Sequence, residues 1–175
     1  MSLDKNELKQ NNYKALISCL EQLVKVYRLL LTVVRNEKQI LIDSNLEELT
    51  ENNKTKEATL IKLKSLETQR MKYARDLAEV CGGDTDAPRL LEIATFFEGQ
   101  ESVKLRNLHS VLDLLVRRVN EINQENEVLV KNALSTISGA MDSIRDTLTE
   151  KPVYGQKGGM KSSKSSDGSL FSKDV

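Results

Sequence analysis

Apolar residues recur at three- and four-residue spacing along most of this chain, which is the pattern of helices that pack against other helices. The clearest case is the stretch 101–150, which has no proline and a single glycine, Gly139. Its first apolar seam consists of Leu105, Leu108, Leu112, Leu115, Val119 and Ile122. Asn126 takes the next place in this seam. The spacing therefore predicts one long helix over 101–149.

A second row of apolar residues begins near the end of this helix, one residue out of step with the first. We call it the second stripe, and its members are Val130, Leu134, Ile137, Met141, Ile144 and Leu148. A shift of one residue turns the apolar face of a helix by roughly 100°. The sequence thus predicts that one face of this helix packs within its own bundle and that the other face, near the end of the helix, contacts something else. The alternative is that the helix bends or frays at Ser138-Gly139 and folds its end back.

Three further helices are predicted before this one. The same spacing runs through Tyr13, Leu16, Leu20, Leu23, Tyr27, Leu30 and Val34, and it predicts a helix over 4–42. Glu37 interrupts that seam and is expected to be salt-bridged or to extend toward solvent. Ser44 begins a capping box for a second helix over 45–80. Glycines end that helix, and Asp86 as N-cap with Pro88 in the first turn predicts a short helix over 88–97.

Together these elements predict an all-α fold. It is an elongated antiparallel bundle of three long helices plus one short helix over residues 1–150, with a flexible C-terminal tail over 151–175. The last helix is expected to extend about a dozen residues, or ~18 Å, beyond the other two. The tail is rich in glycine, serine and lysine, and it cannot bury enough apolar surface to order itself. It is either simply solvated or an arm that docks on a partner.

Composition and charge exclude several functional classes. Aromatic residues make up 4% of the chain and charged residues 30%, which suits long amphipathic helices. The formal net charge is zero, so nucleic-acid binding is not expected. The longest apolar run, Leu29 to Val34, is far shorter than the ~20 residues that span a bilayer. The N-terminus lacks the apolar core of a secretory signal. We therefore expect a cytoplasmic protein that is not inserted in a membrane.

Residues for catalysis or metal binding are not found in a suitable pattern. His109 is the only histidine and has no cysteine or acid at ligand spacing. The segment Gly158-Gly159-Met160-Lys161-Ser162 differs from a phosphate loop in the spacing of its glycines and lysine. The two cysteines, Cys19 and Cys81, are expected to be free thiols because they would lie ~20 Å apart. The sequence predicts no enzyme, no catalytic residue, no metal and no cofactor.

Three groups of residues occur in an order that resembles a known family. The first group is Leu29-Leu30, Glu37, Leu41, Asp43, Leu46, Leu49, Lys54, Lys56, Leu60, Leu63, Leu66 and Arg70. The second is Asn123-Gln124-Glu125-Asn126-Glu127-Val128-Leu129-Val130, and the third is Tyr154-Gly155-Gln156-Lys157-Gly158. Over about residues 15 to 160, their order and spacing are similar to those of FlgN-type flagellar export chaperones.

The resemblance implies a cytoplasmic chaperone of flagellar type III export. Such a protein binds the terminal helical segments of the hook–filament junction proteins, which are of the FlgK and FlgL type. It blocks their premature assembly and delivers them to the export gate at the membrane. The alternative is a non-enzymatic coiled-coil adaptor or a self-associating structural helical protein, and a homodimer is left open. A phosphotransfer domain is disfavoured, since no acid lies beside His109.

The candidate partner-binding residues are Asn123, Asn126, Val130, Leu134, Ile137, Met141, Ile144, Leu148 and Tyr154. The second stripe offers an apolar helix face that can shield a client helix. The two asparagines have two interpretations: Asn126 fixes helix register from within the seam, or the pair hydrogen-bonds the backbone of a partner. The sequence leaves both open.

Overall fold

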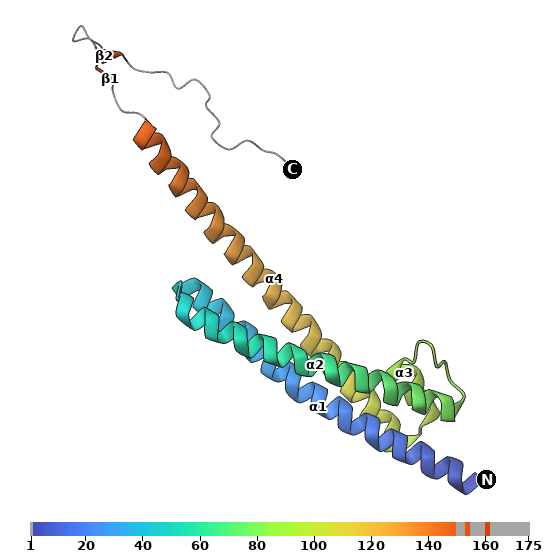
Figure 1. Cartoon of the computed structure of the whole chain (residues 1–175). Helices are drawn as coiled ribbons and strands as arrows, with labels where there is room; N and C mark the ends of the chain where they lie inside the picture. Colours follow the sequence, from blue (N-terminus) through green and yellow to red (C-terminus); the bar gives the residue numbers. More distant parts are fainter. Residues whose placement is uncertain (1, 150–152, 155–159, 162–175) are drawn as a thin grey trace. The chain divides into compact units, whose positions relative to one another are not determined.

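The computed structural model describes residues 2–149, 153–154 and 160–161, and Figure 1 shows the arrangement of its helices. The elements are α1 (Ser2–Asp43), α2 (Leu46–Cys81), α3 (Leu90–Ile93), the 3-10 helix η1 (Ala94–Phe96), α4 (Gly99–Thr149), β1 (Val153–Tyr154) and β2 (Met160–Lys161). These helices confirm the predicted all-α fold class. The chain divides into two units, Met1–Val130 and Lys131–Val175, and each is described by itself.

In the first unit, α1 and α2 form an antiparallel hairpin (Figure 1). The Cys19 thiol donates a hydrogen bond to the Leu66 carbonyl (3.4 Å), and the Asn52 amide donates to the Val33 carbonyl (3.3 Å). In these two contacts, the α1 residue farther from the turn at Ser44 pairs with the α2 residue farther from that turn, as in two antiparallel helices. The hairpin therefore brings the apolar faces of the two helices together along their length.

The first part of α4 lies against α1 and runs in the same direction. The Tyr13 hydroxyl donates to the Glu101 carbonyl (3.1 Å) near the start of both helices. Lys38 and Glu125 form an ion pair (2.7 Å) near the far end of this contact. The three long helices of the first unit therefore run up, down and up, as the sequence predicted.

The core of the first unit is formed by the predicted seams. Leu16, Leu20, Leu23, Leu77 and Leu105 are all fully buried. The α4 seam continues into the core through Leu112, Leu115, Val119 and Ile122. Because the apolar stripes of three helices face one another, each covers surface that a lone helix would leave in water. The helical periodicity of α1 and α4 therefore located the part of the core that these two helices contribute.

The turn between α1 and α2 differs from the predicted capping box by one residue. Asn45, not Ser44, is the N-cap of α2, and its side-chain oxygen accepts a hydrogen bond from the Glu48 amide (3.2 Å). Ser44 has a φ of 55°, which is the left-handed region. A residue in that conformation ends the first helix and cannot also cap the second, so the predicted capping by Ser44 is wrong.

The glycines after α2 end that helix as predicted. Gly82 is the C-cap with a φ of 79°, a conformation that glycine adopts without strain. The short helix that follows begins at Leu90 and not at Pro88, with Arg89 as N-cap. Asp84, not Asp86, organises the intervening loop by accepting from the amides of residues 86 and 87. The predicted start of this helix was therefore two residues too early.

The cysteines are free thiols, as expected: Cys19 is buried and Cys81 is partly exposed. Burial raises the pKa of both thiols above the ordinary value. Among the described residues, no helix combines the length and apolar character needed to cross a membrane.

The second unit contains the last part of α4 and a two-stranded antiparallel pair. α4 continues without a break through Ser138 and Gly139, so the helix does not fray there. Tyr154 of β1 lies opposite Met160 of β2. Most of the tail 151–175 lies outside the described residues, so its flexibility stays a prediction.

Candidate partner-binding surface

Five members of the second stripe lie on α4 within the second unit. The exposed fractions of Leu134, Ile137, Met141, Ile144 and Leu148 are 59%, 58%, 66%, 60% and 65%. Their spacing of three and four residues places all five on one face of the helix. Every residue from 131 to 148 is exposed. A row of large apolar side chains in water is typical of a surface that another polypeptide covers.

Val130, the sixth member of the second stripe, is the last residue of the first unit. Its side chain is 40% exposed. It is thus less covered than the seam residues that precede it, of which Ile122 is 4% exposed. The change from buried to exposed apolar residues along α4 therefore occurs between Ile122 and Val130.

The predicted pair of asparagines belongs to a polar cluster between the three long helices. We define the polar cluster as Glu37, Lys56, Asn123 and Asn126. The Lys56 ammonium lies 2.7 Å from Glu37 Oε2 and donates a second hydrogen bond to Asn123 Oδ1 at 3.2 Å. The side chains of Lys56 and Glu37 are only 23% and 12% exposed. The prediction that Glu37 is salt-bridged is therefore confirmed.

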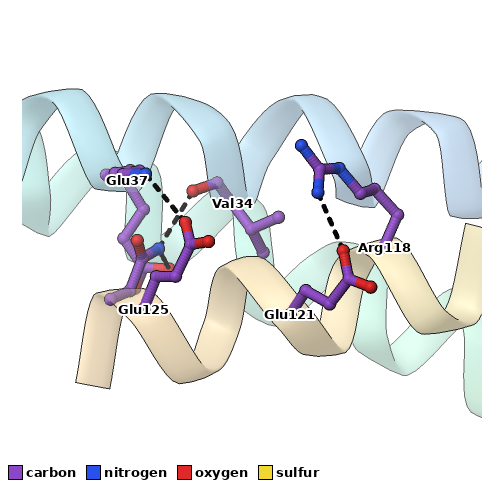
Figure 2. Close-up of polar contacts among 7 residues, drawn as sticks. Val34, Glu37, Arg118, Glu121 and Glu125 are labelled. Carbon is purple, nitrogen blue, oxygen red and sulfur yellow. Dashed lines mark hydrogen bonds and ion pairs between the residues drawn. The ribbon is translucent and has the colours of Figure 1, made fainter. Parts of the chain in front are cut away.

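Asn126 completes this cluster from the α4 seam. Its Nδ2 donates to Glu37 Oε2 and to the Val34 carbonyl, both at 3.0 Å, and Figure 2 shows Val34 and Glu37 on the side of α1 that faces α4. The residue is 4% exposed, and its Oδ1 is buried without a hydrogen-bond partner among the described residues. A buried amide that bonds a neighbouring helix fixes the register of the two helices. These contacts favour the structural interpretation of Asn126.

An exposed ion pair borders the polar cluster on the solvent side. Glu125 Oε2 accepts a hydrogen bond from Lys38 Nζ at 2.7 Å, and both side chains are about half exposed, at 50% and 43%. The hydrogen bond from Lys38, followed by its positive charge, lowers the pKa of the Glu125 carboxyl below its ordinary value. This pair adds a second polar link between α1 and α4 at the same level.

The first unit also contains a groove that the sequence did not reveal. Its volume is about 660 Å³, and its walls include Tyr27 of α1, Met71 of α2, Leu91 of α3 and His109 of α4. Burial is the main cause that raises the pKa of the Tyr27 hydroxyl. Because the walls come from four separate elements, no local sequence signal could have identified the groove. Within the described residues, no three histidine, cysteine or acidic side chains are grouped to hold a metal ion.

The candidate site residues are therefore divided between the two units. Asn123 and Asn126 lie in the bundle of the first unit, whereas the stripe residues from Leu134 onward lie on the exposed helix of the second. Tyr154 lies in β1, and its side chain is outside the described part of the chain.

Comparison with known protein families identifies a match that covers most of the chain. The model of a protein family, described as FlgN protein, matches residues 3–162 of the chain. No curated protein and no solved structure matches the sequence. The matched range includes α1 from its second residue onward, α2, α3, α4 and both strands.

Proposed function

Since the chain belongs to the FlgN family of flagellar export chaperones, we propose that its second stripe binds the terminal helical segments of hook–filament junction proteins. These clients are of the FlgK and FlgL type. The protein shields their segments in the cytoplasm, prevents premature assembly, and delivers the clients to the export gate at the membrane.

The observation that carries this proposal is the row of exposed apolar side chains on the second unit of α4. A client segment that has not yet assembled lacks the neighbours that will later cover its own apolar face. Such a helix can lay that face on the stripe, so that each covers the other. Val130, with its partly exposed side chain, extends the stripe by one position.

The size of the stripe suits a reversible complex. A fully buried large apolar side chain contributes about 1.5–3 kcal/mol, so the exposed part of each stripe residue is worth roughly 1 kcal/mol. Five such residues and an equal surface on the client give about 10 kcal/mol, from which association subtracts at least ~4 kcal/mol. The remainder, at most about 6 kcal/mol, corresponds to a dissociation constant of roughly 40 μM or weaker. A delivery step requires release, and this affinity permits it.

The test uses the full chain and purified terminal segments of FlgK-type and FlgL-type proteins from the same source. We expect Ile137→Asp or Ile144→Asp to weaken capture by more than about tenfold, because a charge then replaces an apolar contact. Thr136→Asp is the matched control: it adds the same charge to the same exposed helix, away from the stripe. Circular dichroism and the melting temperature should remain nearly unchanged in all three variants.

Two results would contradict the proposal. If both isoleucine variants unfold the protein, the stripe is part of the core. If light scattering shows a wild-type dimer that both variants convert to a monomer, while capture persists, the stripe serves self-association. The second result would favour the alternative of a self-associating structural protein.

A further inference from the structure

The shapes of the side chains in the second stripe indicate how many helices pack against it. In heptad notation, position a holds the side chains without a β-branch, Leu134, Met141 and Leu148. Position d holds the β-branched Ile137 and Ile144. In parallel coiled coils, β-branched residues at a with leucine at d favour two strands, whereas leucine at a with isoleucine at d favours three or four. The stripe has the second arrangement, so its side chains suit a space between several helices.

A row of small residues widens the stripe on one flank. This row, which we call the small flank, takes position g beside the d row and consists of Ala133, Ala140 and Thr147. All three residues are exposed. A helix that faces the core of a bundle carries small or apolar residues at a, d and one further position, whereas the seam between two helices needs only a and d. The width of the face therefore agrees with the shapes of its side chains.

The stripe alone offers little area for a specific interface. The five stripe residues of the second unit are 58–66% exposed. A large apolar side chain removes roughly 60–120 Å² from water when it is fully covered, so the five together offer roughly 200–350 Å². Specific interfaces bury about 800 Å² on each partner. A partner must therefore contact more of this helix than the stripe, and a second partner helix on the small flank provides such contact.

These observations specify the architecture of the occupant. We propose that the client presents two packed helices to this part of α4, and that α4 lies in the groove between them. One client helix covers the a and d rows, and the other covers the d row and the small flank. An exposed single helix is convex, so the groove that receives it belongs to the partner. This inference rests on the proposed function, because it describes how the same clients hold the same stripe.

Other copies of this chain are a poorer source of the additional helices. Within the described part of the second unit, the only helix is the end of α4, so each copy contributes one helix. Two copies would bury roughly 400–700 Å² of stripe surface in total, which is below the ~1,000 Å² of a specific interface. Assembling three or four copies costs more freedom of motion than binding one client whose two helices are already joined.

The experiment compares the binding of two synthetic probes to the full chain. One probe is a helical hairpin taken from a three-helix bundle whose third helix is left out, so that it displays an apolar groove. The other probe is one helix of that hairpin as a single peptide. We expect the hairpin to bind at least about tenfold more tightly than the peptide, because it covers both rows and is already ordered. Isothermal titration calorimetry measures the affinity and the expected ratio of one chain per hairpin.

A pair of double variants tests whether the small flank is the cause of this preference. Ala133→Glu with Ala140→Glu places charges where the second helix packs, so hairpin binding should fall about tenfold, to the level of the single peptide. Binding of the single peptide should remain unchanged. Asn132→Glu with Ser135→Glu is the matched control, since it adds the same charges at exposed positions on the opposite side of the helix. This control should keep the preference. Equal effects of both double variants would overturn the proposal, because they would show an effect of net charge.

Other outcomes separate this inference from the proposed function. Equal affinity for the hairpin and the peptide, with both lost in Ile137→Asp, overturns the helix pair but leaves the stripe as a binding surface. A hairpin preference without capture of FlgK-type or FlgL-type segments supports a two-helix partner and removes the proposed clients. A trimer or tetramer of the free chain in sedimentation velocity, converted to a monomer by Ile137→Asp, would overturn the client pair, because copies of this chain would then supply the helices.

Discussion

Two isoleucines on α4 allow a matched test of which apolar residues hold the protein together. Ile122 lies in the first seam and is 4% exposed, whereas Ile144 lies in the second stripe and is 60% exposed. Both occupy the same helix and would be changed to alanine. The two substitutions remove the same atoms and differ mainly in what those atoms contact.

The expected losses follow from these burial values. Ile122→Ala removes apolar contacts with the core and leaves a cavity, which costs about 2–5 kcal/mol of unfolding free energy. In Ile144→Ala most of the side chain was already in water. The higher helix propensity of alanine, about 0.4 kcal/mol, offsets much of what remains. We therefore expect the second change to lie within about 0.5 kcal/mol of the wild type.

Urea unfolding followed by circular dichroism measures both values. A loss of about 3 kcal/mol moves the midpoint by more than ~1 M urea for a typical slope of 1–3 kcal/mol per molar. The measurement is repeated at a tenfold higher protein concentration, because self-association would make the midpoint depend on concentration.

The reasoning would be refuted by a large effect at Ile144. A loss above ~1.5 kcal/mol that is independent of concentration would mean that the second stripe is buried within one chain. A loss of this size that appears only at high concentration would mean that a second copy covers it.

Three further predictions concern the polar contacts and the exposed part of α4. Lys56→Met should lower the unfolding free energy by about 2–4 kcal/mol, since it leaves the mostly buried Glu37 carboxylate without its cation. The double variant Lys56→Met with Glu37→Met should recover most of this loss in urea unfolding. A double variant that is no more stable than Lys56→Met would contradict the ion pair. Amide hydrogens of 131–148 should exchange much faster than those of the buried part of α4, and slow exchange measured by mass spectrometry would indicate hidden cover. The lowered pKa of Glu125 means that its ion pair stabilises the fold above the unfolded-state pKa and that this contribution disappears as pH falls through the folded-state pKa. Lys38→Gln should raise that pKa toward the ordinary value in an NMR titration, and an unchanged value would contradict the assigned cause.

The helical fold could be predicted because its signal is local. Leu105, Leu112 and Val119 repeat at a spacing that only a helix turns into one continuous face, and the structure buries all three. The end of α2 at Gly82 was predictable for the same reason, since glycine adopts the left-handed conformation without strain. The N-cap of α2 was harder to predict, because Ser44 and Asn45 are adjacent and both are residue types that cap helices well.

The polar cluster and the groove could not be predicted to the same extent. Asn126 was placed in the seam from its spacing, but its partner Val34 is 92 residues away along the chain. The sequence identified Glu37 as the exception in its helix without identifying Lys56 as its partner. Long-range pairs of this kind depend on how far one helix slides along another, which side-chain periodicity does not determine.

The sequence alone determined that the chain forms long helices, where most of them end, and that α4 carries two apolar rows one residue out of step. Only the tertiary structure decided that the first row is buried and that the second stripe from Leu134 to Leu148 is exposed. The physical reason is that periodicity records which face of a helix is apolar, whereas burial depends on whether another segment lies against that face.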